Sequence, residues 1–155
     1  MQHMFFNKIL RIILCAASLG YASMSGAHSA GATMDPSNSV RSFTGFALIT
    51  CFDDGNGPAD NLIANIKDTS APHSNLLVNL QVISPKRDRA ISITDTVSGD
   101  AEPSPWVTLH GGNGSYLLLV NKTDAGARSF VIDYHCMTAS GDHTGTEITA
   151  VKQFE

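Results

Sequence analysis

Short β-rich stretches separated by turn-forming residues follow one another from Arg41 to the end of the chain. In residues 90–94, apolar and hydroxyl-bearing residues alternate, which is typical of a strand with one face in water. In residues 130–136, every second residue is a large apolar residue or a cysteine, so we expect that face of the strand to be buried. The pattern predicts strands near 43–52, 62–67, 76–83, 90–94, 106–109, 115–121, 129–136 and 146–152.

The breaks between these stretches carry Gly, Pro, Asn and Asp, which favour turns. Their even spacing of about 8–12 residues is typical of sandwiches and barrels. We therefore predict an all-β fold, an antiparallel β-sandwich of the jelly-roll or immunoglobulin-like kind with about seven to eight strands. Residues 62–67 are the least regular of the predicted strands, and a helical turn is the alternative there. We expect residues 111–114, Gly-Gly-Asn-Gly, to form a hairpin turn.

The first 27 residues have the three-part pattern of a secretory signal peptide. Lys8 and Arg11 precede an apolar run over 12–19, and small residues follow. That run is shorter than the roughly 20 residues that cross a bilayer, so we expect a cleaved leader and no membrane span in the mature protein. Small residues fit a cut after any of three positions, which are Ala22, Ala27 and Ala32.

The cut after Ala27 divides the chain into a signal peptide (1–27), a flexible leader (28–40) and a β-sandwich domain (41–155). The 155 residues are enough for one domain. The formal net charge is -4 and becomes -6 without Lys8 and Arg11. An acidic chain lacks the basic face that phosphate backbones require, so we expect no nucleic-acid partner. We expect a secreted or periplasmic location.

Two cysteines, Cys51 and Cys136, remain after the predicted leader is removed. An even number of cysteines in an oxidising compartment predicts one disulfide bond. A metal-thiolate pair and two free thiols are the alternatives, but neither cysteine has the spacing of a zinc site.

Part of the chain resembles the bacterial pre-peptidase C-terminal domain, a small β-sandwich on secreted proteins. The similarity covers roughly residues 95–136. It rests on Trp-Val-Thr-Leu at 106–109, on Gly-Ser-Tyr-Leu-Leu-Leu-Val at 114–120, and on Phe-Val-Ile-Asp-Tyr at 130–134. This chain differs in ending the last of these strands with His135 and Cys136 and in adding a further strand. The resemblance implies an accessory or binding module without catalytic residues.

Five of the six histidines follow the predicted leader. A cut after Ala27 makes His28 the first residue, whose α-amine and imidazole together would chelate Cu(II). A second imidazole from His110, His135 or His143 would complete a copper site. The alternative is a solvated His28 in a flexible leader, and packing or a surface hydrogen bond explains His135 equally well.

A second candidate for a metal, calcium, is a stretch rich in oxygen ligands. It contains Asp53, Asp54, Asn56 and Asp60. The spacing is not that of an EF-hand loop, and turn formation is the alternative. The one basic cluster, residues 86–89 (Lys-Arg-Asp-Arg), predicts a solvated turn.

No nucleophile elbow, phosphate-binding loop or zinc-protease motif occurs in the sequence, so we assign no catalytic residues. We predict a non-catalytic binding or accessory protein whose partner is a protein or a carbohydrate. The alternative function is copper binding through His28 and a second histidine. A hydrolase is a further alternative, for which the sequence offers no residues.

Overall fold

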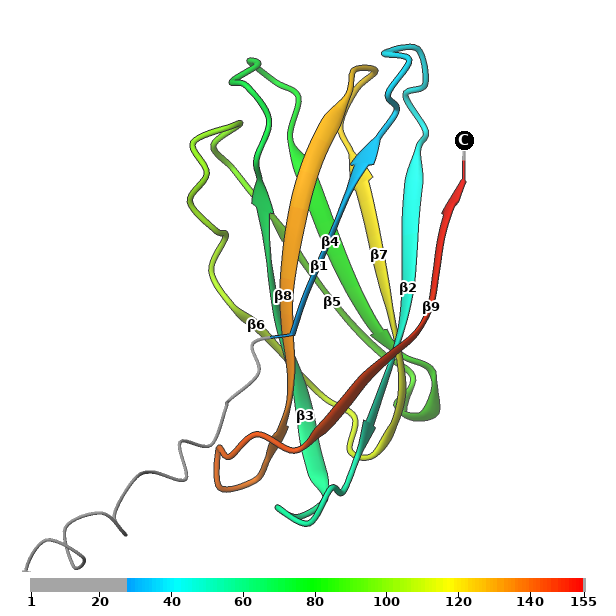
Figure 1. The fold of residues 1–155 in the computed structure, drawn as a ribbon, viewed down its shortest axis with the longest axis vertical. Coiled ribbons are helices and arrows are strands. Elements are labelled where there is room, and N and C mark those ends of the chain that lie inside the picture. Colours follow the sequence, from blue (N-terminus) through cyan, green and yellow to red (C-terminus); the bar gives the residue numbers. More distant parts are fainter. Residues whose placement is uncertain (1–27, 155) are drawn as a thin grey trace, which may run out of the picture.

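Two antiparallel sheets pack face to face in the computed structural model, which describes residues 28–154 (Figure 1). One sheet has the strand order β1-β8-β3-β6, and the other has the order β5-β4-β7-β2-β9. The strands are β1 (His28–Met34), β2 (Thr44–Phe52), β3 (Ala59–Asp68), β4 (Val78–Ser84), β5 (Arg89–Thr94), β6 (Val107–His110), β7 (Gly114–Lys122), β8 (Arg128–Thr138) and β9 (Gly145–Phe154). The predicted antiparallel β-sandwich is confirmed, with nine strands where we expected seven to eight.

The additional strand is β1, which lies where we expected a flexible leader. It pairs with β8 along its whole length, from His28 opposite Tyr134 to Met34 opposite Arg128. Its residues are mostly Ala, Gly and Ser, which have low β-propensity, and for that reason the sequence pattern did not reveal a strand. Small residues suit this position, because a Cβ on Gly31 would lie 2.7 Å from the Phe130 carbonyl oxygen.

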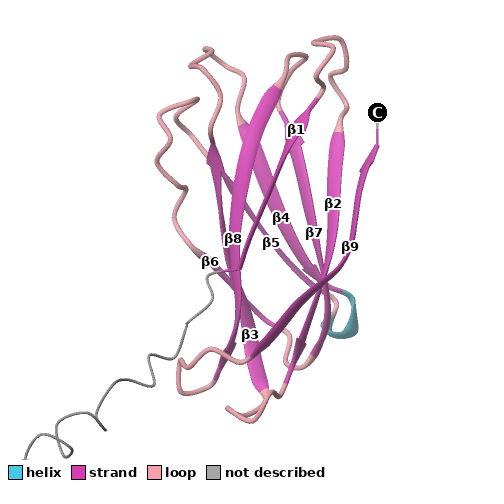
Figure 2. Ribbon diagram, viewed as in Figure 1, coloured by secondary structure: helices cyan, strands magenta, loops and turns pink. Residues whose placement is uncertain are grey.

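The segment 62–67, for which a helical turn was the alternative, is the middle of β3. This strand lies between β8 and β6, and most of its residues are buried. Within residues 28–154 the only helical element is the short 3-10 turn η1 (Pro85–Arg87), drawn in cyan in Figure 2. No helix in this range has the length and apolar character needed to cross a bilayer.

The core lies between the two sheets, and the disulfide bond joins them. Cys51 on β2 and Cys136 on β8 are bonded, which confirms the prediction. Both side chains are buried, and Cys136 shares the inward face with Phe130, Ile132 and Tyr134, as the alternation along this strand predicted.

Residues 111–113 do not form the hairpin turn that we predicted. They join β6 to β7, and these strands belong to different sheets. Glycines favour both a hairpin turn within one sheet and a sharp connection between two sheets, so composition alone does not distinguish these two cases. The connection is held by the Gly112 N–H, which donates to the Asp60 carbonyl oxygen on β3 at 3.0 Å.

Candidate metal centre

Three histidines from three segments of the chain lie together at one end of β8, and we call them the histidine cluster: His28, His135 and His143. The ring centroids of His135 and His143 are 4.4 Å apart, and those of His28 and His135 are 6.1 Å apart. The sequence analysis proposed these three as metal ligands, and the fold brings them into one place.

Strand pairing brings His28 to the end of β8, and the turn after β8 accounts for the contact between His135 and His143. His28 is the first residue of β1 and lies opposite Tyr134, the neighbour of His135. After β8 the chain reverses in a tight turn, in which the Thr138 N–H donates to the Asp142 carbonyl oxygen at 2.8 Å. The reversal places His143 opposite Met137, two residues from His135 on the same strand. Alternate residues of a strand share one face, so the rings of His135 and His143 meet.

Two aromatic rings border the cluster. The Trp106 ring lies just before β6, with its centroid 5.7 Å from that of His135. The Tyr134 ring centroid is 6.0 Å from that of His28. His135 is only 8% exposed, whereas the neighbouring Trp106 is 48% exposed. The cluster thus contains a buried imidazole, and the fluorescent indole ring of Trp106 lies close enough to respond to a change at it.

The surroundings of His135 favour the neutral form of its imidazole. Burial lowers the pKa of its imidazole, and the neighbouring His143 and His28 lower it further. Neutral imidazole is the form that binds metal ions. The Nδ1 atoms of His28 and His135 are both buried and have no hydrogen-bond partner within the described residues. Unpartnered buried nitrogens are rare in folded proteins, and a bound ligand is one explanation for them.

Within residues 28–154, no three His, Cys, Asp or Glu side chains already surround a common point in the way that a metal ion requires. A site at the cluster therefore needs either a rotated ring or a ligand that is not a side chain. The α-amine of His28 is such a ligand if the chain is cut after Ala27. It would supply a nitrogen beside the unpartnered Nδ1 of the same residue.

No family model, curated protein or solved structure matches the chain. The resemblance to the pre-peptidase C-terminal domain stays a prediction.

His110, the fourth histidine predicted as a ligand, lies apart from the cluster. It ends β6, and β3 separates this strand from β8. Its Nδ1 is 2.7 Å from Oδ2 of Asp60, and both side chains are substantially exposed. Hydrogen bonds from Asn61 and His110 lower the pKa of Asp60, so this carboxylate is charged near neutral pH. His110 thus belongs to a different arrangement from the other three.

The four oxygen-bearing residues predicted as calcium ligands do not converge on one point. Oδ1 of Asp53 accepts the N–H groups of Gly55 and Gly57, at 2.8 and 3.1 Å. Oδ1 of Asp54 accepts the N–H of Asn56 at 3.2 Å. Asp60 lies beyond this loop, on β3, and bonds to His110. These are the bonds of turn-forming aspartates, the alternative that the sequence analysis gave.

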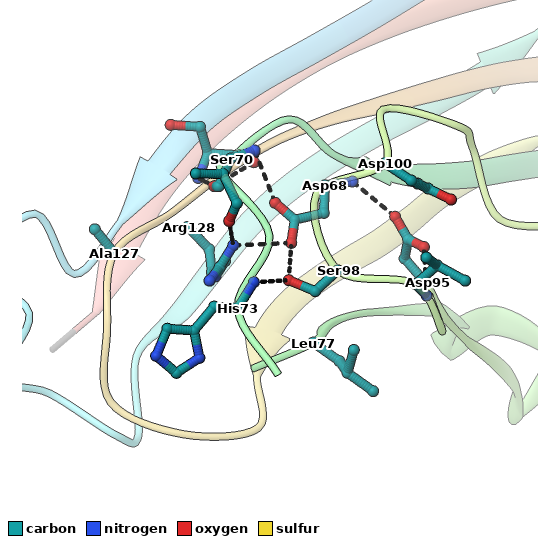
Figure 3. Close-up of polar contacts among 12 residues, drawn as sticks. Asp68, Ser70, His73, Leu77, Asp95, Ser98, Asp100, Ala127 and Arg128 are labelled. Carbon is teal, nitrogen blue, oxygen red and sulfur yellow. Dashed lines mark hydrogen bonds and ion pairs between the residues drawn. The ribbon is translucent and has the colours of Figure 1, made fainter. Parts of the chain in front are cut away.

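The sequence analysis missed a buried polar network at one end of the sandwich, shown in Figure 3. Asp68 at the end of β3 accepts from the Arg128 guanidinium at 3.3 Å and from the Ser98 hydroxyl at 3.3 Å. Arg128 also donates to the Ala71 carbonyl oxygen at 2.7 Å. Asp95 accepts the N–H of Asp68, and burial raises the pKa of the Asp95 carboxyl. These bonds join the end of β3 and the start of β8 to the loops that contain Ala71 and Ser98, so the network ties these segments together.

A second buried ion pair was also missed. Nζ of Lys122 is 2.9 Å from Oδ2 of Asp35, and both side chains are fully buried. The Gly126 N–H donates to the same oxygen at 2.9 Å. The pair is formed by residues 87 positions apart, so only the fold reveals it. A lysine at the end of an alternating strand normally extends into solvent, which is why its position carried no signal in the sequence.

Proposed function

We propose that this chain is an exported, non-catalytic protein that binds Cu(II) at the histidine cluster. The observation that carries the proposal is the convergence of His28, His135 and His143, in which two buried Nδ1 atoms have no hydrogen-bond partner among residues 28–154. Export is the prediction of the sequence, and it supplies the cut that would free the His28 amine.

The chemistry of the cluster favours copper among the common metal ions. Its donors are nitrogens, whereas calcium and magnesium select oxygen ligands. Cys51 and Cys136 are joined in the disulfide bond, so neither offers a thiolate. For a given set of nitrogen donors, Cu(II) binds more tightly than the other divalent metals of the first transition row.

The proposed coordination uses three nitrogens from two residues. The α-amine and Nδ1 of His28 close a six-membered chelate ring on the metal. A second imidazole, from His135 or His143, occupies a third position. Because this arrangement needs only two side chains, it is compatible with the absence of a set of three converging side chains among residues 28–154. The neutral state of His135 suits this role, since no proton has to be displaced.

The experiment uses the chain beginning at His28, whose true mature N-terminus is first established by mass spectrometry. Cu(II) is titrated while the fluorescence of Trp106, the single tryptophan, is recorded. The ring lies 5.7 Å from that of His135, so bound Cu(II) should quench it. We expect one equivalent to bind with nitrogen hyperfine structure in the electron paramagnetic resonance spectrum.

Three variants locate the site. His28→Ala and the double variant His135→Ala/His143→Ala should each weaken Cu(II) binding by more than about tenfold, because changes even outside the ligand shell cost that much. His110→Ala is the matched control, since it removes an imidazole outside the cluster, and it should bind like the parent chain. Equal affinity in all four proteins would refute the proposal, and so would a loss confined to His110→Ala.

Acetylation tests the amine. The chain beginning at His28 with its α-amine acetylated keeps all three imidazoles and gains no other free amine beside them. We expect the acetylated chain to bind Cu(II) more weakly than the unmodified chain. If both bind alike, the α-amine is not a ligand and the chelate is wrong.

A further inference from the structure

A second polar site lies away from the histidine cluster, in a groove of about 380 Å³ near the β6–β7 connection. We call it the arginine groove. It is lined by Asp60 from β3, Arg87 from η1, Arg89 from β5, and His110, Gly111 and Gly112 from the end of β6 onwards. Residues from three separate segments of the chain therefore line one groove. The sequence analysis treated them separately, as a solvated basic turn, a candidate copper ligand (His110) and a candidate calcium ligand (Asp60).

The groove is positively charged on an otherwise acidic chain. Arg87 and Arg89 are both exposed, and neither forms an ion pair with any acidic group in residues 28–154. Their neighbour Lys86 donates to the Asn113 carbonyl oxygen at 3.2 Å, which anchors the basic turn beside the groove. Two guanidinium groups are thus available to an anion, and each can donate two parallel hydrogen bonds to it.

The single carboxylate in the groove is already occupied. Oδ2 of Asp60 accepts from the Asn61 amide at 3.0 Å and lies 2.7 Å from Nδ1 of His110. This contact fixes the orientation of the His110 ring and assigns its Nδ1 hydrogen to Asp60. Nε2 of His110 is the ring nitrogen left for a ligand.

The backbone of the groove is packed closely against the domain. A Cβ on Gly111 would lie 2.5 Å from the Ser84 hydroxyl oxygen and 2.6 Å from the Tyr116 hydroxyl oxygen. The Tyr116 hydroxyl donates to the Gly112 carbonyl oxygen at 2.9 Å. The floor of the groove is therefore held in place, so binding need not order this part of the chain.

We propose that the arginine groove binds a tetrahedral oxyanion, a phosphate or sulfate group, between Arg87, Arg89 and His110. The two guanidinium forks match the several acceptor oxygens of such a group, and His110 lines the same groove. The groove is open to solvent, so it can admit the group as part of a larger molecule, and a modified sugar and a lipid headgroup both carry such a group.

The first test is a titration of the chain beginning at His28 with inorganic phosphate and with sulfate, followed by nuclear magnetic resonance. We expect saturable shifts in the amide signals of Gly111 and Gly112. Arg87→Ser/Arg89→Ser should weaken binding by at least about tenfold, as expected for the loss of charged hydrogen bonds. His110→Gln should weaken it by a smaller factor.

The control is Arg41→Ser/Lys152→Ser, which removes the same charge at exposed positions outside the groove. It should bind like the parent chain. The proposal fails if this variant loses as much affinity as the groove variant, because the anion would then respond only to net charge. It also fails if the amide shifts rise linearly without saturation.

A further pair of titrations distinguishes the two sources of the group. One uses a soluble sugar phosphate and a soluble sugar sulfate, and the other uses vesicles of phosphatidylglycerol. Binding of the sugars that the groove variant abolishes identifies a glycan ligand, and binding of the vesicles alone identifies a lipid headgroup. Binding of neither, or binding that survives in the groove variant, would overturn the proposal.

Discussion

Reduction of the Cys51–Cys136 bond should remove a large part of the stability of this domain. The bond closes a chain segment with a sequence separation of 85 residues. In the chain-entropy model, such a loop restricts the unfolded state by about 4.6 kcal/mol at 25 °C. Small domains are stable by only about 5–15 kcal/mol in total. The reduced protein should therefore unfold at a temperature about 15–20 °C lower than the oxidised protein.

The comparison of oxidised with reduced protein isolates the cross-link, because both forms keep the two buried sulfur atoms. Urea unfolding followed by circular dichroism, with and without a phosphine reductant, measures the difference in free energy. The Cys51→Ala/Cys136→Ala variant is a second measurement, and it should be less stable than the reduced protein because it also loses buried volume. Equal unfolding free energies for the oxidised and reduced forms would refute the reasoning, since the bond would then not constrain the unfolded chain.

Two further predictions concern the buried ion pairs. Asp68→Asn leaves the Arg128 guanidinium buried without a counter-ion, so urea unfolding should show a loss of about 3–5 kcal/mol; a change below about 1 kcal/mol would mean that solvent reaches the pair. At Asp35, burial alone would raise the pKa, but hydrogen bonds from the Gly126 N–H and from Lys122 outweigh it and hold the pKa well below the ordinary 3.8. A carboxyl group whose pKa is lower in the folded state stabilises the fold at pH values above its pKa in the unfolded chain, and this stabilisation is lost as the pH falls. The difference in unfolding free energy between the parent chain and Asp35→Asn should therefore shrink from pH 5 to pH 2. A constant difference would contradict this.

The fold class followed from sequence because alternation and turn residues are local signals. The alternation in residues 90–94 and 130–136 indicates a strand within a few positions. Cys136 is an even number of residues from Phe130, so it was predicted on the same, buried face. Two predictions were wrong because the structures concerned depend on partners that are distant in the sequence. Strand β1 consists of small residues and becomes a strand only against β8, and residues 111–113 connect two sheets because β6 pairs with β3.

The candidate site could be predicted only in part. The ability of His28 to chelate a metal depends only on this residue and on cleavage of the chain after Ala27, so the sequence was enough to predict it. The choice of partner depends on the fold, which puts the ring of His135 near those of His28 and His143 and leaves His110 next to Asp60. The arginine groove and the Asp68–Arg128 network were missed for the same reason. Each joins residues from separated segments, and no local pattern brings such residues together.

The strand order has a consequence for how this protein acquires its shape. Among the strands of residues 28–154, only β4 and β5 are neighbours both in the chain and in a sheet. Every other pairing has to wait for a long loop to close, which places folding in the slow range of milliseconds to seconds. Strand β1 is the extreme case, since its partner β8 lies about a hundred residues away. In a nascent chain, His28 therefore meets His135 only after nearly all of the chain has emerged, so the histidine cluster is among the last features to form.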